Sequence, residues 1–285
     1  MSAERIVRAN GVDLCVQTFG EPSEPAILLI AGSTSSLDGW PEEFCVQLAA
    51  ASRFVIRYDH RDTGRSTSYP PGEPGYTGSD LRADALGILD ALGVARAHLV
   101  GVSMGGGMAQ VLAIEHPDRV ASLTLIATSS GPADDLPPVV PELRAFFDNP
   151  PPEPDWSDRA AVIDYMVAGE LPFRGVVGWD EAERRATAAR VMDRTVNLKS
   201  SLSNHWIMIG GDDDGERLRP RLGRITAPTL VIHGTRDPLF PFPHGEALAA
   251  EIPGARLLPL EGVGHEVPPR PTWPTVLTAL VAHTA

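Results

Sequence analysis

The chain has 285 residues, of which 43% are hydrophobic and 21% are charged, a composition typical of a globular protein with one large core. The net charge of −13 and the single lysine, Lys199, argue against nucleic acid or anionic lipid as a partner, because binding phosphates requires clustered basic residues. No apolar run approaches the roughly 18–20 residues that span a bilayer, and residues 1–10 lack the apolar centre of a signal peptide. We therefore expect a cytoplasmic protein with no membrane partner.

The first 130 residues alternate between strand-like and helix-like patterns. Most of the predicted strands are short continuous apolar runs, as expected of strands that are covered on both faces. The predicted strands in this part are 6–9, 12–19, 26–30, 54–58, 98–102 and 123–127. The predicted helices are 41–51, a helix that runs from an N-cap at Ser79 to Leu92, and 104–116. This alternation predicts an α/β protein with a mostly parallel, doubly wound sheet.

Residues 131–224 interrupt this pattern with a Pro-rich, acidic stretch and helix-like runs at 160–168 and 180–194. Strands and helices alternate again at 229–233, 245–251, 256–260 and 273–283. We therefore predict a core domain of residues 1–130 and 225–285, with residues 131–224 inserted between two strands as a mainly helical cap. Such an insertion would cover the crevice at the strand ends where open α/β sheets bind ligands. The run Asp212 to Asp214 is interpreted as a solvated loop, because nothing nearby supplies convergent metal ligands.

The chain contains two cysteines, Cys15 in a strand-like run and Cys45 in a helix-like run. Buried free thiols in a reducing compartment are favoured over a disulfide between them. Neither cysteine lies on a turn beside a base, so neither is a candidate nucleophile.

The segment Gly101 to Gly105 has the pattern Gly-x-Ser-x-Gly, with a predicted buried strand directly before it and a helix directly after it. In this context the serine occupies a sharp turn, and the glycines avoid clashes between the strand and the helix. The turn exposes Ser103 Oγ at the head of a helix, whose free N–H groups favour developing negative charge. Ser103 is therefore the predicted nucleophile, with a glycine-rich packing turn as the alternative.

A serine hydroxyl needs a base to take its proton, and His265 is the candidate, in a glycine-flanked loop between the last strand and the C-terminal helix. Asp237 follows the preceding strand and is the predicted acid that orients His265, in the chain order Ser, Asp, His. The competing interpretation of Asp237 is a surface turn before Pro238. For the remaining histidines we expect a structural role or no role. They are His60, His98, His116, His205, His233, His244 and His283.

Acyl transfer also requires two N–H donors for the tetrahedral oxyanion. The Met104 backbone N–H, directly after the nucleophile, is the first predicted donor. The second is the Ser33 N–H, in the loop after strand 26–30, where Gly32 permits a tight turn. Because both donors are backbone groups, changing their side chains would test this prediction poorly.

These motifs, together with residues 58–66 (Tyr-Asp-His-Arg-Asp-Thr-Gly-Arg-Ser), resemble the α/β-hydrolase superfamily. The variant turn at residues 61–64 and the Leu37-x-x-Trp40-Pro41 segment are most similar to aclacinomycin methylesterase-like actinobacterial serine esterases. The resemblance covers the chain outside residues 131–224 and implies an α/β-hydrolase fold and hydrolysis of a carboxylic ester, including a methyl ester on a polyketide. The family often has His-Gly before the oxyanion residue, whereas Ala31 precedes Gly32 here.

The insertion is rich in aromatic residues that can line a pocket for an apolar, bulky ester. The aromatic residues are Phe146, Phe147, Tyr165, Phe173, Trp179 and Trp206, with Phe240 and Phe242 just beyond Asp237. The residues predicted to contact the substrate are Gly32, Phe146, Phe147, Trp206 and Phe240.

The leading hypothesis is a serine esterase acting on a small-molecule ester through an acyl-enzyme. A second hypothesis keeps the triad but makes the protein a cofactor-free perhydrolase or a carbon–carbon bond hydrolase, because residues 103–107 resemble the perhydrolase elbow. The third is a non-catalytic ligand-binding protein on this fold, which would have no need for all three groups together. No motif requires a metal or organic cofactor, and the sequence leaves open whether the chain forms a homo-oligomer.

Overall fold

The computed structural model describes residues 3–131, 134–210 and 217–285, and these residues form one eight-stranded sheet. The run at residues 212–214 lies outside the described residues. In chain order the strands are β1 (Arg5–Ala9), β2 (Val12–Phe19), β3 (Ala26–Ile30), β4 (Phe54–Tyr58), β5 (Ala97–Val102), β6 (Val120–Ile126), β7 (Thr229–Gly234) and β8 (Arg256–Leu260). The spatial order is β1-β2-β4-β3-β5-β6-β7-β8. Strand β2 is antiparallel to both of its neighbours, β1 and β4, and all other neighbouring pairs are parallel.

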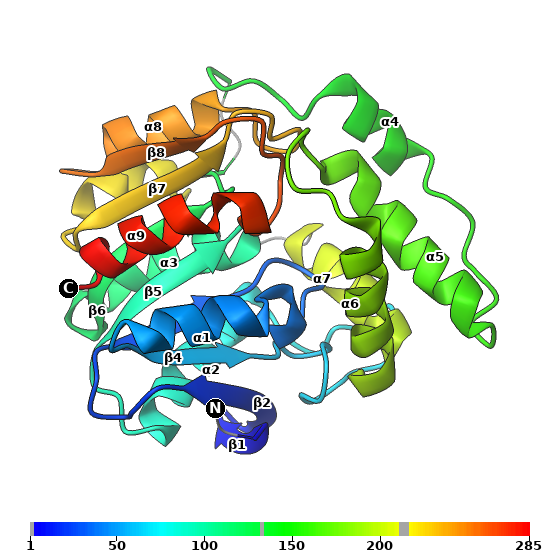
Figure 1. The fold of residues 1–285 in the computed structure, drawn as a ribbon, viewed down its shortest axis with the longest axis horizontal. Coiled ribbons are helices and arrows are strands. Elements are labelled where there is room, and N and C mark those ends of the chain that lie inside the picture. Colours follow the sequence, from blue (N-terminus) through cyan, green and yellow to red (C-terminus); the bar gives the residue numbers. More distant parts are fainter. Residues whose placement is uncertain (1–2, 132–133, 211–216) are drawn as a thin grey trace.

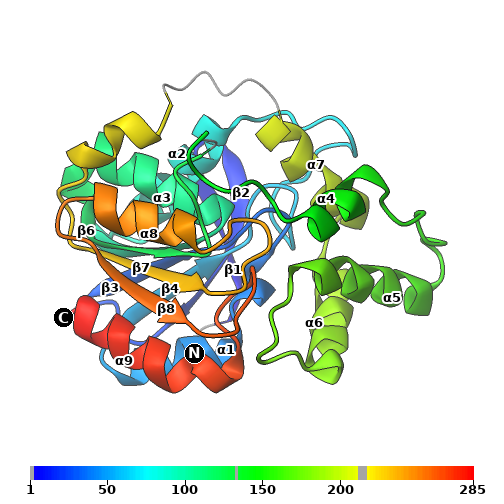
Figure 2. The same ribbon diagram turned by 90° about the horizontal axis from the view of Figure 1, so that it is seen from above.

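Helices cover both faces of the sheet (Figures 1 and 2). They are α1 (Glu42–Ala50), α2 (Gly78–Ala91), α3 (Met104–Glu115), α4 (Pro141–Asp148), α5 (Arg159–Glu170), α6 (Glu181–Arg194), α7 (Leu198–Gly210), α8 (Pro243–Glu251) and α9 (Trp273–His283). Figure 2 shows α1 and α9 on one face and α2, α3 and α8 on the other. Helices α4 to α7 lie together beside the sheet and connect β6 to β7. Within the described ranges, no helix combines the length and hydropathy that crossing a membrane requires.

The period-2 geometry of the central strands explains why they are apolar throughout. In β3, Leu28 and Ile30 pack into the hydrophobic cluster on one face of the sheet, while Ile27 and Leu29 pack into the cluster on the other. Successive side chains of a strand point to opposite faces, so a strand covered by helices on both faces must be apolar at every position. Each fully buried Leu or Ile contributes about 1.5–3 kcal/mol to this core.

The N-terminus of α2 differs from the prediction. The N-cap is Thr77, whose side chain accepts from the Asp80 N–H while the Asp80 carboxylate accepts from the Thr77 N–H, and Ser79 lies inside the helix. This reciprocal pair satisfies two otherwise free N–H groups, an arrangement that a lone serine at position 79 cannot provide. The predicted N-cap was therefore wrong by two residues.

Cys15 and Cys45 are both buried free thiols, as their sequence context predicts. Burial raises the pKa of each thiol to about 12. Both cysteines are therefore protonated near neutral pH, and the thiolate form that gives cysteine its reactivity is scarce.

Candidate active site

Ser103 occupies the turn between β5 and α3, in the strand–turn–helix form that the Gly-x-Ser-x-Gly motif predicts. Its backbone has φ 53° and ψ −118°, a conformation that is strained for a residue with a side chain. Two hydrogen bonds hold it: the Ser103 N–H donates to the Ile126 carbonyl at 3.0 Å, and Thr128 Oγ1 donates to the Ser103 carbonyl at 2.8 Å. Both partners lie in or next to β6, so the neighbouring strand maintains the strained turn.

The two glycines of the motif are needed for space. A Cβ on Gly101 would collide with the backbone of Gly105, and a Cβ on Gly105 would collide with the Ile30 and Ala31 carbonyl oxygens. The first residue of α3 is Met104. The close approach of strand, turn and helix therefore requires glycine at both positions.

The structure brings Ser103, His265 and Asp237 into one hydrogen-bonded row. His265 Nε2 lies 3.0 Å from Ser103 Oγ, and His265 Nδ1 lies 2.9 Å from Asp237 Oδ2. The second oxygen of Asp237 accepts from the Leu239 and Phe240 N–H groups at 2.9 and 2.8 Å. The carboxylate is therefore held in a single orientation behind the imidazole.

The charge on Asp237 determines which nitrogen of His265 carries a proton. Burial disfavours the charged form of Asp237, but the ion pair and hydrogen bond with His265 outweigh it and lower the pKa of Asp237 below its usual value. The ionised carboxylate accepts from Nδ1–H, so the lone pair of Nε2 faces the hydroxyl of Ser103. This arrangement suits proton transfer from Ser103 to His265.

A second histidine lies near the same oxygen of Asp237. His233 Nε2 is 3.6 Å from Asp237 Oδ2 and donates to the Phe240 carbonyl at 2.8 Å. Burial lowers the pKa of His233, so near neutral pH its ring carries no positive charge that would compete with His265 for the carboxylate. Through its bond to Phe240, His233 shapes the loop that carries Asp237.

The loop after β3 lies against Ser103. A Cβ on Gly32 would be in ordinary contact, 3.5 Å from Ser103 Cβ, and the following Thr34 has a left-handed φ of 62°. Met104 is the first residue of α3, where backbone N–H groups have no acceptor within the helix. The roles of the Ser33 and Met104 N–H groups as oxyanion donors stay a prediction.

A row of aromatic rings extends from His265 into the inserted segment. The Phe240 ring centroid lies 5.4 Å and the Phe173 centroid 6.0 Å from that of His265. Phe147 lies 5.9 Å from Phe173 and 6.0 Å from Trp206, which is 43% exposed. Phe146 lies next to Phe147, with ring centroids 6.3 Å apart and the rings tilted. Four of the residues predicted to contact substrate, Phe146, Phe147, Trp206 and Phe240, therefore belong to one aromatic surface beside the imidazole.

Other aromatic residues of the insertion lie elsewhere. Tyr165 packs against Trp156, with ring centroids 6.1 Å apart. Trp179 is covered by the guanidinium groups of Arg174 and Arg184. These residues therefore pack within the inserted segment and are not part of the row beside His265.

The inserted segment is hydrogen-bonded to the loop that carries His265. The His265 N–H donates to the Phe173 carbonyl at 2.8 Å, and the Val176 N–H donates to the Gly262 carbonyl at 2.7 Å. A Cβ on Gly264 would collide with the backbone of residues 173–175. The loop and the inserted segment are therefore packed backbone against backbone, and each limits the movement of the other.

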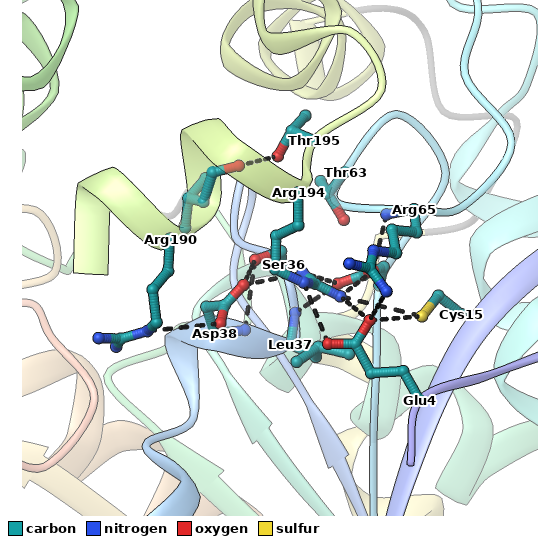
Figure 3. A network of polar contacts seen from close by, with 12 residues as sticks. Glu4, Cys15, Ser36, Leu37, Asp38, Thr63, Arg65, Arg190, Arg194 and Thr195 are labelled. Atoms are coloured by element: carbon teal, nitrogen blue, oxygen red, sulfur yellow. Dashed lines mark hydrogen bonds and ion pairs between the residues drawn. The ribbon is translucent and has the colours of Figure 1, made fainter. Parts of the chain in front are cut away.

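Arg194, at the end of α6, lies among three carboxylates of the core. Its guanidinium is 2.8 Å from Asp38, 2.9 Å from Asp59 and 3.0 Å from Glu4. Figure 3 shows this side chain reaching from the helix toward Asp38 and Glu4, with the sulfur of Cys15 at the edge of the network. Burial raises the pKa of Asp59 although Arg194 opposes it. Removing the cation would therefore leave a buried carboxylate without its partner.

Residues 25–268 match the alpha/beta hydrolase fold family. The chain belongs to this family. Two relatives of this α/β-hydrolase are rhodomycin D methylesterases, from Streptomyces sp. strain C5 at 35% identity and from Streptomyces peucetius at 34%, each covering 98% of this chain and 97% of the relative. Among solved structures, the enol-lactonase of Burkholderia xenovorans LB400 has a TM-score of 0.72 at 27% identity, covering 98% of this chain and 99% of its own. The predicted fold class and the predicted likeness to methylesterases are confirmed.

Three residues of this α/β-hydrolase that border the site carried no recognisable signal. His205 and Arg194 contact loops at the ends of β3 and β4, yet neither has a recognisable motif around it. Phe173 is one of several aromatic residues in the insertion, and nothing in the sequence selects it. His205 and Arg194 contact core loops that are more than a hundred residues away in the chain, and Phe173 contacts the His265 loop. Only the fold reveals these contacts.

Proposed function

We propose that this α/β-hydrolase cleaves a carboxylic ester through an acyl-enzyme formed on Ser103. Family membership and the methylesterase relatives make the protein a serine hydrolase of carboxylic esters. The observation that supports the assignment of its groups is the continuous row from Ser103 Oγ through His265 to Asp237, at 3.0 and 2.9 Å. A non-catalytic binding protein has no need for this alignment.

In the proposed reaction, Ser103 Oγ attacks the ester carbonyl carbon while its proton moves to His265 Nε2. The Ser33 and Met104 N–H groups donate to the oxyanion that forms. The intermediate collapses as the carbon–oxygen bond to the alcohol breaks, and His265 returns the proton to the departing oxygen. A water molecule then gives a proton to His265 and attacks the acyl carbon, which releases the acid and restores Ser103. Asp237 stays ionised throughout.

The proposed substrate is a methyl ester on a bulky, ring-containing acid. Phe240 and Phe173 lie beside the imidazole, and Phe147 and Trp206 continue the surface outward. Offset or edge-to-face contact with such rings favours a planar aromatic substrate. The relatives named above act on rhodomycin D as methylesterases, and they do not favour perhydrolysis or carbon–carbon bond cleavage.

The proposal extends to partner and compartment. The partner is a small-molecule ester, with no nucleic acid or membrane and no cofactor. A reducing compartment, the cytoplasm, is supported by the two free buried thiols. Whether the chain forms a homo-oligomer is tested by light scattering on the purified protein.

The test compares wild type with Ser103→Ala on a panel of methyl and p-nitrophenyl esters that vary in ring content. We expect Ser103→Ala to lower kcat on the order of 10⁶-fold, because loss of the nucleophile disables the triad as a unit. Ser122→Ala is the matched control, because Ser122 is a buried serine of β6 that bonds to His98 away from the site. Turnover retained by Ser103→Ala, or a folded wild type that cleaves none of the esters, would contradict the proposal.

A further inference from the structure

His205 connects α7 to the loop that faces Ser103. The side chain is fully buried and makes two hydrogen bonds to backbone groups far away in the chain. Its Nδ1 is 2.8 Å from the Thr34 nitrogen, and its Nε2 is 2.9 Å from the Arg61 carbonyl oxygen. One imidazole from the inserted segment therefore touches both the loop after β3 and the loop after β4.

The partners of His205 determine its protonation. A backbone N–H can only donate, so Nδ1 accepts from Thr34 and carries no proton. A carbonyl oxygen can only accept, so Nε2 carries the proton and donates to Arg61. The ring is therefore neutral with a single tautomer. Burial, together with the nearby His60, lowers the pKa of His205 to about 4, which keeps this arrangement intact across the neutral range.

A second histidine holds the other end of the same loop. His60 Nε2 is 3.1 Å from the Ala31 carbonyl oxygen, and the His60 and His205 rings meet edge to face with centroids 5.8 Å apart. Residues 31 and 34 are thus each bonded to an imidazole. Between them lie only Gly32, which faces Ser103, and Ser33, which carries the predicted oxyanion N–H.

The backbone between these two anchors needs support. Thr34 has a φ of 62°, and a non-glycine residue in this region costs roughly 1–2 kcal/mol relative to right-handed backbone. The bond to His205 offsets this cost. Without an acceptor for its N–H, Thr34 can relax to negative φ, and the peptide planes on either side of it rotate. We expect the neighbouring peptide, which carries the Ser33 N–H, to turn with them and to displace this predicted oxyanion donor.

We propose that His205 is a positioning residue that holds the Ser33 N–H toward the oxyanion through its bond to Thr34. This inference rests on the proposed function, because the Ser33 N–H has an oxyanion to bind only if Ser103 attacks an ester. It makes α7 part of the catalytic apparatus, although no group of α7 takes part in the chemistry. His205 acts on the transition state and not on the binding of the ester.

Two conservative variants separate this role from a merely structural one. Asparagine places an oxygen near the position of Nδ1, so His205→Asn keeps an acceptor for Thr34 and loses the bond to Arg61. Glutamine places its amide nitrogen near the position of Nε2, so His205→Gln keeps the bond to Arg61 and loses the acceptor for Thr34. Each variant retains one of the two hydrogen bonds, and the two side chains are similar in polarity.

We expect His205→Gln to lower kcat by about 10²–10³-fold with little change in KM, the loss that follows removal of one oxyanion donor. His205→Asn should keep kcat within about tenfold of wild type. The rate at which a fluorophosphonate labels Ser103 should fall in the same pattern, because the phosphoryl oxygen uses the same donors. The matched control is His98→Asn, a partly buried histidine of β5 bonded to Ser122, which should leave both rates unchanged.

The labelling rate distinguishes failure of this inference from failure of the proposed function. A wild type that is labelled but cleaves no ester overturns the ester assignment and leaves the comparison of variants valid. Equal labelling rates for the His205→Asn and His205→Gln variants, each measured below its own Tm, overturn the positioning role whatever the substrate. A loss that appears only in KM or Tm has the same consequence, because it marks His205 as a structural contact.

Discussion

The central sheet and the inserted segment of residues 131–224 are held in place by different forces. Every residue of β3, β4 and β7 is buried, and these strands contribute apolar side chains to both faces. Helices α4, α5 and α6 bury few residues, namely Leu143, Val162, Val167 and Ala188. On α7 the buried residues Ser200, Ser201, Asn204 and His205 are polar. Apolar burial therefore builds the sheet, whereas hydrogen bonds and ion pairs attach the inserted segment to it.

Three of the polar attachments are made to loops at the ends of the core strands. Arg194 binds Asp59 after β4, His205 binds Thr34 after β3, and the backbone at Phe173 binds the loop of His265 after β8. Directional contacts fix relative orientation more closely than apolar contacts do. The inserted segment thus has little core of its own, but it makes directional contacts with the loops around the predicted site.

The largest effect should come from the part of the site that belongs to the core. Asp237→Asn places an amide beside His265 Nδ1, which favours the wrong tautomer and leaves Ser103 without a base. We expect kcat to fall about 10⁴-fold with folding retained, as measured by ester hydrolysis and thermal unfolding. A kcat within tenfold of wild type would show that Asp237 does not orient the base.

A matched pair of leucines compares the two regions directly. Leu28 in β3 and Leu143 in α4 are both fully buried. We expect Leu28→Ala to lower the free energy of unfolding in urea by about 3–5 kcal/mol, since the sheet cannot close around the cavity. Leu143→Ala should cost about 2 kcal/mol, because α4 has fewer packed neighbours to hold the cavity open. The reverse order would contradict the comparison.

The ion-pair attachment is tested by Arg194→Met, which leaves the buried Asp59 carboxylate without its cation. We expect a loss of about 3 kcal/mol at pH 8. Burial already raises the pKa of Asp59, and loss of Arg194 raises it further. As the pH falls, Asp59 of the folded variant therefore takes up a proton before Asp59 of the unfolded chain does. The loss in free energy of unfolding relative to wild type shrinks as the pH falls toward 5.

The control for this substitution is Arg159→Met, which breaks an ion pair to Asp193 whose side chains are 48% and 63% exposed. An exposed pair contributes about 0–1 kcal/mol, so this variant should unfold close to wild type. If Arg194→Met had the same free energy of unfolding as Arg159→Met at pH 8, the ion pairs of Arg194 would not attach the inserted segment to the core.

The last effect, small at each pH step, is the pH dependence of stability from one histidine of each region, His60 and His205. Burial lowers the pKa of both to about 4 in the folded protein, against about 6.5 in the unfolded chain. Between these two pKa values the unfolded chain binds more protons than the folded protein. The free energy of unfolding is therefore highest above pH 7 and falls as the pH drops through 6 toward 4, by roughly 1 kcal/mol per pH unit for each ring. Urea unfolding from pH 7.5 to 5 measures the slope. His205→Asn should make it shallower, and an unchanged slope would contradict the assignment.

The sequence-based predictions were more accurate for the central sheet than for the inserted segment. Strands 26–30, 54–58 and 256–260 were predicted with the bounds that are observed, because an apolar run between turns has few other conformations available. Helices α5 and α6 were located approximately, whereas α4 and α7 were not predicted. The buried face of α7 is polar, so the hydrophobic periodicity that reveals a helix is missing from it.

The sequence by itself determined the fold and the three residues of the hydrogen-bonded row, because apolar runs define the strands and the Ser103, Asp237 and His265 loops follow strand ends in a fixed order. Only the tertiary structure decided which side chains support those loops. His205, Arg194 and Phe173 act through contacts with backbone and carboxylates that are distant in the chain. Such contacts depend on where α6 and α7 come to rest against the sheet, and a pattern confined to neighbouring residues cannot encode that position.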